Sequence, residues 1–291
     1  MFLSKKIKRV KVMIRENKAV PGIFKSVYKG FIKPNLNNFN YLKFKDNYKQ
    51  HIIFCATLPK SGSSWLSNML SSIKGFDQFT PYEWELDNHD ISLETFKRYR
   101  KRLGVIKGHT RGRINNVNVL RTLNLKYIIT LRDPRDKIIS EYWYIKKLPG
   151  HWDFNNVNTM TLNEFINYKL ESNEYKTETI DWVEEWLKNR DVEKSMIIKY
   201  EDLLADTFGI FQGIISFLDI NLSTTEIKLI IDRNNFKKIS GRKPGEEDTK
   251  NFLRKGIAGE WKEVFTNEQK EMFTKIGEHL IEKLGYKSTA D

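Results

Sequence analysis

Short apolar runs along the chain predict four buried strands, over residues 52–58, 103–107, 126–131 and 195–199. Each run is rich in β-branched residues and is bounded by polar or turn-forming residues. Apolar residues at helical spacing predict helices near 162–170, 179–188 and 208–218, and a final amphipathic helix ending at Leu284. No period dominates in residues 76–102, and glycine and proline breakers predict a polar loop over 237–253. Alternating strands and helices indicate an α/β fold with three α/β/α layers around a central, mainly parallel sheet.

The segment that follows the first predicted strand has the character of an anion-binding loop. Lys60 is followed by a small-residue turn, 61–64, and then by a helical pattern through Trp65 and Met69. Small residues bring backbone N–H groups together at a helix start, and a lysine adds a point charge. The same residues could form an ordinary Ser/Gly turn. They do not form a Walker A loop, GxxxxGK[ST], because Lys60 precedes the only glycine.

Polar residues also follow two other predicted strands. Lys107 and His109 lie at the end of the second, Arg132 closes the third, and Ser140 lies early in the next helix. Ligands bind at the carboxyl edge of open α/β sheets, so we expect these side chains to face one crevice.

The positive charge is concentrated at the N-terminus, which divides the chain into a basic arm, 1–49, and a domain, 50–291. The formal net charge is +13, but residues 1–50 hold thirteen Lys/Arg against two acids. The remaining residues carry only +2, which argues against nucleic-acid binding. Residues 1–20 show a basic amphipathic helical pattern, which could contact an anionic membrane or dock on the domain.

Composition indicates a globular protein with one large domain and no cystine. The 291 residues are 40% hydrophobic and 13% aromatic, enough for a full core. The lone cysteine, Cys55, lies inside the first predicted strand and is expected in the core. No apolar run has membrane-spanning length and no signal-peptide core is present, so we expect a soluble, cytoplasmic protein.

Three segments in order resemble one enzyme family, the sulfotransferases that use 3'-phosphoadenosine 5'-phosphosulfate (PAPS). PKSGSSW at 59–65 is similar to their PKSGTTW loop, and RDPRDKIIS at 132–140 is similar to their 3'-phosphate segment. RKGIAGEWKEVFT at 254–266 resembles their RKGxxGDWKxxFT, with Glu260 in place of aspartate. The resemblance covers about four-fifths of the chain and implies the P-loop nucleotide-hydrolase-like sulfotransferase fold.

The resemblance also implies roles for the matched residues. The loop would bind the 5'-phosphosulfate, and a second group would hold the 3'-phosphate. Tyr200 and Phe236 match positions that touch the adenine and its surroundings, and Trp65 matches one that stacks on it; each could equally be core. The implied donor-site residues are Lys60, Ser61, Gly62, Ser63, Ser64 and Trp65 for the phosphosulfate, and Arg132, Ser140, Arg254, Lys255 and Gly256 for the 3'-phosphate.

The implied general base is His109. The family carries a KTHxP segment, of which this chain keeps Lys107 and His109 but not the threonine or the proline. A neutral imidazole suits removal of a proton from an acceptor hydroxyl. The other four histidines lie outside any matched motif and are expected to be structural or at the surface. Lys60 and Lys107 would stabilise the developing charge, and adenosine 3',5'-bisphosphate (PAP) would leave without a metal.

Several alternatives stay open at this point. A small-molecule kinase using magnesium-ATP on a similar sheet is the second interpretation, and a non-catalytic peripheral protein held by its basic arm is the third.

The acceptor could be a small molecule, a carbohydrate or a lipid, since aromatic content does not distinguish among them. Lys262, Thr266 and Glu271 resemble part of the family's KxxxTVxxxE dimer motif, but Asn267 replaces its valine, so a homodimer is also open.

Overall fold

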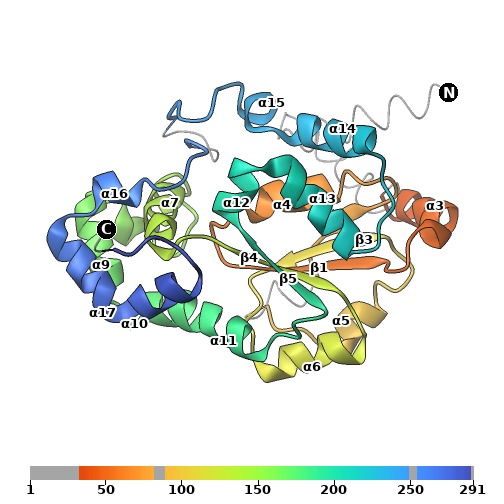
Figure 1. The fold of residues 1–291 in the computed structure, drawn as a ribbon, viewed down its shortest axis with the longest axis horizontal. Helices are drawn as coiled ribbons and strands as arrows, with labels where there is room; N and C mark the ends of the chain where they lie inside the picture. Colours follow the sequence, from red (N-terminus) through yellow and green to blue (C-terminus); the bar gives the residue numbers. More distant parts are fainter. Residues whose placement is uncertain (1–32, 82–88, 249–253, 290–291) are drawn as a thin grey trace.

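Five parallel strands form the centre of the protein (Figure 1). The computed structural model describes residues 33–81, 89–248 and 254–289, so the predicted helix within 1–20 lies outside the described residues. The sheet order is β2-β3-β1-β4-β5. The strands are β1 (Ile52–Thr57), β2 (Asp77–Phe79), β3 (Gly104–Gly108), β4 (Tyr127–Leu131) and β5 (Ser195–Lys199).

The central strand, β1, is buried on both faces, as its continuous apolar run predicts. It pairs with β3, with Phe54 opposite Ile106, and with β4, with Phe54 opposite Tyr127. Successive side chains enter two different cores: Ile52 and Phe54 one, Ile53 and Cys55 the other. The predicted three-layer α/β/α fold with a parallel sheet is therefore confirmed, and Cys55 is in the core as expected.

The larger core lies between one face of the sheet and a long series of helices. Trp186, Phe165 and Phe273 are among its fully buried side chains. The elements that contribute to it are α5 (Leu93–Lys97), α6 (Ile114–Thr122), α7 (Pro134–Lys146), α8 (Phe154–Val157), α9 (Leu162–Glu171), α10 (Asn173–Tyr175), the π-helical turn η4 (Lys176–Asp181), α11 (Trp182–Asn189), α16 (Trp261–Val264) and α17 (Asn267–Lys283).

The second core lies on the opposite face, under fewer helices. Met69 and Leu70 of one helix pack there with Phe211 and Ile214 of another. Figure 1 shows α4, α12 and α13 on this side of the sheet and α5, α6 and α11 on the other. The helices are α4 (Ser63–Leu70), α12 (Tyr200–Ala205), α13 (Thr207–Phe217) and α14 (Thr224–Asn234).

Two local predictions differ from the structure. Residues 76–102 show no clear period, yet 77–79 form the edge strand β2. The breakers within 237–253 predict a loop, but α15 (Phe236–Ser240) occupies its start, with the side chain of Asn235 capping it. A short polar helix of this kind is stabilised by its cap and neighbours and leaves no apolar stripe in the sequence.

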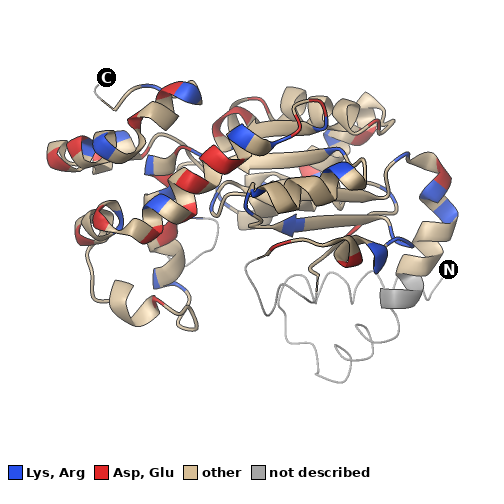
Figure 2. Cartoon of the chain, turned by 90° about the horizontal axis from the view of Figure 1, so that it is seen from below, with Lys and Arg blue, Asp and Glu red and all other residues tan. Residues whose placement is uncertain are grey.

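The N-terminal end of the described chain packs on the domain. Helix α3 (Lys33–Phe44) and the turn η2 (Lys45–Asn47) lead to Tyr48, whose ring packs edge-on against Phe76 and whose hydroxyl donates to the carbonyl of Lys74. Acidic and basic side chains are interspersed along the described helices (Figure 2). Among the described residues, no helix combines the length and apolarity needed to cross a membrane.

Candidate active site

A cavity of about 500 Å³ lies at the carboxyl ends of the strands. The loop after β1, His109 after β3, Arg132 after β4 and Tyr200 after β5 all line it. All the residues predicted for the site except Ser61 contribute to its wall: Lys60, Gly62, Ser63, Ser64, Trp65, Lys107, His109, Arg132, Ser140, Tyr200, Phe236, Arg254, Lys255 and Gly256.

Ser61 instead anchors the loop from beneath. Its hydroxyl lies 2.6 Å from the carbonyl oxygen of Leu58 and 2.7 Å from Oγ1 of Thr130, and it is buried. On either side of it, Lys60 and Gly62 have positive φ angles of 68° and 73°. This pair of left-handed residues turns the chain sharply between β1 and α4, and the turn directs Ser61 inward and Lys60 toward the cavity.

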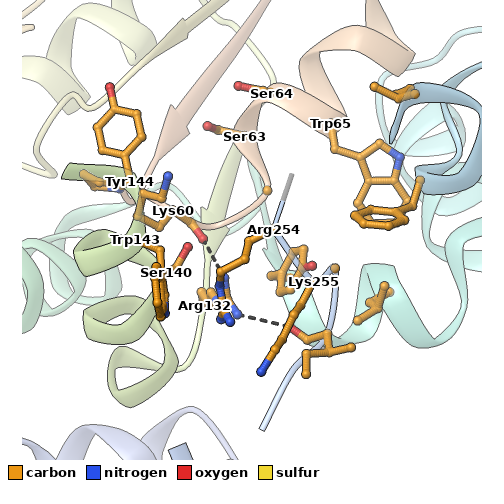
Figure 3. A pocket seen from close by; sticks show the side chains of 18 of the residues that line it. Lys60, Ser63, Ser64, Trp65, Arg132, Ser140, Trp143, Tyr144, Arg254 and Lys255 are labelled. Atoms are coloured by element: carbon orange, nitrogen blue, oxygen red, sulfur yellow. Dashed lines mark hydrogen bonds between the residues drawn. The ribbon is translucent and has the colours of Figure 1, made fainter. Parts of the chain in front are cut away.

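Helix α4 begins at the cavity wall. The first N–H groups of a helix have no partner within it, so those of residues 63–65 are available to an anion. Figure 3 shows Ser63 and Ser64 at this helix start. Lys107 reaches the same place, with Nζ 3.3 Å from Oγ of Ser64. Burial lowers the pKa of Lys107.

Lys60 lies in an environment that disfavours its charge. Its Nζ is 4.0 Å from the centre of the Tyr144 ring, on α7. Burial, reinforced by the Arg132 guanidinium, lowers the pKa of Lys60 to about 7. An anion in the cavity would restore the protonated form, so the charge of Lys60 is coupled to ligand binding.

Arg132 connects the loop to the C-terminal segment. Its Nη1 donates to the carbonyl oxygen of Lys60 at 3.3 Å and its Nη2 to that of Ile257 at 3.1 Å (Figure 3). The guanidinium carbon lies 4.6 Å from the centre of the Tyr200 ring. The Nε of Arg132 and the Nε1 of Trp65 are buried and have no hydrogen-bond partner among the described residues. Buried donors of this kind call for an acceptor from a ligand or water.

Arg254 and Lys255 enter the cavity from the C-terminal segment, and both are paired with carboxylates. Arg254 Nη1 lies 2.7 Å from Glu247 and 3.0 Å from Glu260, and Lys255 Nζ lies 2.6 Å from Glu260. Although burial opposes it, the hydrogen bonds from the two cations keep the pKa of Glu260 below its usual value. Gly256 follows with φ 64°, and a Cβ there would lie 2.7 Å from the Phe236 ring.

His109 is held in one tautomer. Its Nδ1 lies 2.7 Å from the carbonyl oxygen of Thr57, the last residue of β1. A carbonyl only accepts, so Nδ1 carries the proton and Nε2 of the neutral ring is an acceptor. Burial lowers the pKa of His109 to about 4, which keeps the ring neutral near pH 7.

The sequence missed part of this cavity. Thr57, which orients His109, lies within the apolar run of β1 and carries no signal of a functional role. Lys147 lines the wall without belonging to any matched motif, and Asn234 and Ile239 line it on either side of the matched position Phe236. Trp143 and Tyr144 also line it, just beyond the end of the matched segment 132–140. Among the described residues, the lining includes lysines and arginines but no aspartate or glutamate.

A family model for the sulfotransferase domain matches residues 50–285 of the sequence. The chain belongs to this family. It is therefore a sulfotransferase, an enzyme that transfers the sulfuryl group from PAPS and releases PAP as the product. Membership of this family gives no support to the magnesium-ATP kinase alternative. The predicted enzyme class and donor are therefore confirmed.

Individual relatives agree with this sulfotransferase assignment. The chain is 31% identical over 160 residues to the guinea pig (Cavia porcellus) 3-beta-hydroxysteroid sulfotransferase, a match over 52% of this chain and 54% of that protein. It is 28% identical to the guinea pig 3-alpha-hydroxysteroid sulfotransferase, over 76% of this chain and 80% of that one. The crystal structure of mouse sulfotransferase SULT7A1 complexed with PAP shares the fold, with a TM-score of 0.62, 21% identity and coverage of 86% and 94%.

Proposed function

We propose that this sulfotransferase transfers the sulfuryl group from PAPS to the hydroxyl of a small, largely apolar acceptor, with His109 as general base. The acceptor oxygen attacks sulfur while its proton passes to Nε2 of His109. The bond between sulfur and the bridging oxygen breaks, and its electron pair leaves with the 5'-phosphate of PAP. Lys60 and Lys107 then stabilise the charge that develops on the leaving group and the transferred oxygens.

The observation that carries the donor part of the proposal is the composition of the cavity wall. Its charged lining residues are all cations, and two buried N–H groups in it, on Arg132 and Trp65, lack an acceptor among the described residues. A bisphosphate nucleotide would bring anionic groups to the lysines and arginines of the wall, and hydrogen-bond acceptors to the two buried N–H groups. The proposed 3'-phosphate site is Arg132, Ser140, Arg254, Lys255 and the backbone of Gly256; the proposed phosphosulfate site is the loop 60–65.

The acceptor part rests on two supports. Trp143 and Tyr144 add aromatic surface beside Lys60, which suits an apolar ring system better than a sugar with many hydroxyls (Figure 3). The guinea pig relatives are named for hydroxysteroids, which are compact apolar alcohols. The proposal locates the reaction in the cytoplasm, where a lone thiol such as Cys55 stays reduced.

Radiolabelled PAPS and a panel of acceptors test the proposal. The panel contains a 3-hydroxysteroid, a long-chain alcohol, a simple phenol and a monosaccharide, each with and without a metal chelator. We expect label in the steroid or the long-chain alcohol, unaffected by chelation. Transfer to the sugar alone would reject the acceptor class, and a failure to bind PAP would reject the donor site.

Two further proposals concern the basic arm and residues 262–271. The basic segment 1–20 is proposed to bind an anionic membrane surface, where each cation contributes about 1 kcal/mol to binding. Deletion of 1–20 should then abolish sedimentation with anionic vesicles but not catalysis.

A homodimer through residues 262–271 is proposed from the partial motif. Thr266, which belongs to this motif, also caps the N-terminus of α17 through its hydroxyl.

A further inference from the structure

The segment that carries His109 lacks the residues that stiffen it in the family. Gly108 stands where KTHxP has its threonine, and Arg111 stands where it has its proline. Glycine and arginine restrict the backbone much less than threonine and proline do. A general base must nevertheless be held to within a fraction of an ångström of its productive position. Other contacts must therefore position His109 in this chain.

His89 makes such contacts, although no matched motif includes it. Its Nδ1 accepts a hydrogen bond from the backbone N–H of His109 at 2.8 Å. Its ring stacks on the ring of His109, with centroids 5.5 Å apart and planes 19° from parallel. Its carbonyl oxygen accepts from Oγ1 of Thr110 at 2.7 Å. One residue thus contacts the backbone and the ring of His109 and the side chain that follows.

The remaining contacts of this segment come from the other side. The indole Nε1 of Trp182 donates to the carbonyl oxygen of His109 at 3.0 Å, and that of Trp186 donates to the carbonyl oxygen of Thr110, also at 3.0 Å. These bonds fix the carbonyl groups, whereas His89 fixes the amide and the imidazole. Together with the bond from Nδ1 of His109 to Thr57, the stacking leaves the catalytic ring little freedom to rotate.

His89 is itself held rigidly enough to do this. Its backbone has a φ of 60°, a left-handed conformation that is uncommon outside glycine but that asparagine, aspartate and histidine adopt more often than other residues do. The next two residues are tied to α6: Asp90 accepts from Nδ2 of Asn116 at 2.7 Å, and the N–H of Ile91 donates to Oδ1 of the same side chain at 3.0 Å. Asp90 also pairs with Arg113 at 3.0 Å. The position of His89 is therefore fixed from outside the active site.

We propose that His89 is a positioning residue for the general base, and that its Nδ1, by accepting the N–H of His109, sets the orientation in which His109 receives the proton. This inference rests on the proposed role of His109. It requires a neutral His89 with the proton on Nε2, because Nδ1 acts as the acceptor. Burial, together with the nearby Lys107, lowers the pKa of His89, in agreement with that state.

Two substitutions of His89 test the contribution of its hydrogen-bond acceptor, Nδ1, separately from that of its aromatic ring. Asparagine at position 89 places Oδ1 where Nδ1 was and tolerates a positive φ; phenylalanine keeps a flat ring and removes the acceptor. With the acceptor of the panel that gives the highest turnover, we expect His89→Phe to lower kcat by about a hundredfold, as misplaced catalytic groups do. His89→Asn should stay within about fivefold of the wild type. PAP affinity should change by less than about twofold in both, because the donor site is not altered.

A double-mutant cycle ties the effect to His109. In a His109→Ala background, His89→Phe should cause no further loss of kcat, because nothing is left to position. NMR of the ¹⁵N-histidine-labelled protein gives a readout without any sulfuryl acceptor: exchange of the His109 amide proton with solvent should become faster in His89→Phe, which removes its hydrogen-bond acceptor, and stay nearly unchanged in His89→Asn. His279→Phe, at an exposed histidine on α17 that pairs with Glu184, is the matched control.

The outcomes are distinguishable. Equal losses in the two variants, additive losses in the cycle, or a parallel fall in kcat and PAP affinity would overturn the positioning role. Wild-type activity in His89→Phe would do the same, even with His109→Ala inactive. If His109→Ala itself stays active, the proposed base is wrong and not only its support.

Discussion

The ring of Tyr200 packs directly against the α-carbon of Gly62: a Cβ on Gly62 would lie 2.7 Å from Cδ2 of the tyrosine. Gly62 also has a φ of 73°, which costs a residue with a side chain roughly 1–2 kcal/mol. The loop 60–65 after β1 and the first residue after β5 are therefore packed closely against each other. This contact closes the cavity where Trp65 also meets Tyr200, with ring centroids 6.5 Å apart.

Gly62→Ala should consequently damage both stability and the donor site. We expect the free energy of unfolding to fall by about 1–2 kcal/mol, and PAP affinity to fall at least about tenfold, or 1.4 kcal/mol, because the ring must move. Denaturant titration and calorimetry measure the two effects. Gly150→Ala is the matched control, since a Cβ added at Gly150 would meet nothing within 4 Å; equal effects of the two changes would contradict the fit.

Removing the 3'-phosphate of the ligand should weaken binding strongly. Hydrogen bonds to charged groups contribute about 1.5–3 kcal/mol each, so losing two costs about 3–6 kcal/mol. Adenosine 5'-monophosphate should then bind about a hundred- to ten-thousandfold more weakly than PAP. Arg132→Ala should narrow that gap, whereas Arg121→Ala, at an exposed position of α6, should not. Equal affinities for the two nucleotides in calorimetry would remove the proposed 3'-phosphate site.

Binding of PAP should be accompanied by proton uptake at Lys60. With a pKa of about 7, this amine is largely neutral at pH 8, and the bound anion favours its protonated form. Calorimetry at pH 8 in buffers of different ionisation enthalpy should show uptake that disappears near pH 5.5, where Lys60 is already charged. Lys60→Gln should abolish it, and undiminished uptake in that variant would assign the proton to another group.

The same shift affects the stability of the ligand-free protein. The pKa of Lys60 is lower in the folded than in the unfolded chain, so between about pH 7 and 10.5 the unfolded state binds more protons. Within that window the contribution of Lys60 makes the folded protein more stable as pH rises. Lys60→Gln should flatten this part of the stability profile in denaturant titrations.

Glu247→Gln should strengthen nucleotide binding. The carboxylate of Glu247 lies 2.7 Å from Arg254 and 3.5 Å from Lys255, the two cations proposed for the 3'-phosphate. Because the ligand must compete with it, neutralising this partly exposed group should raise PAP affinity by up to about fivefold, the equivalent of one exposed ion pair. Glu263→Gln, at an exposed position of α16, is the control. Weaker PAP binding in Glu247→Gln would instead make the carboxylate a support for Arg254.

His109→Ala should lower turnover by about two or more powers of ten, the usual contribution of a general base. PAP affinity should stay within about twofold, because the role proposed for the ring is to accept the proton of the substrate hydroxyl and not to bind the donor. Steady-state rates and calorimetry on the same preparation measure the two. Wild-type turnover in His109→Ala would show that His109 is not the general base.

Most of the fold could be predicted because its three central strands, β1, β3 and β4, are almost entirely buried. Their apolar runs need no tertiary information. β5 is only partly buried, but its run is also apolar, and the predicted 195–199 strand has its bounds. The edge strand β2 could not be found in the same way. Its three residues are half-buried and pair only with β3, so the partner and not the local pattern determines the conformation.

The site was predictable as a set of matched motifs, but its internal arrangement was not. Ser61 and Ser63 look equivalent in the sequence, yet the left-handed backbone at Lys60 and Gly62 turns one hydroxyl into the core and the other to the cavity. Likewise, no pattern indicates that Glu247 and Glu260 engage the proposed phosphate-binding cations, because that contact depends on how the segment folds back.

The burial of Cys55 makes it an internal reporter of sheet opening. It is the single cysteine, it lies fully inside the central strand, and burial raises the pKa of its thiol to about 12. A thiol reagent therefore reacts only with molecules in which β1 has separated from its helices. Labelling rates with and without PAP would measure how far nucleotide binding stabilises the sheet, on the unmodified chain and with no engineered probe.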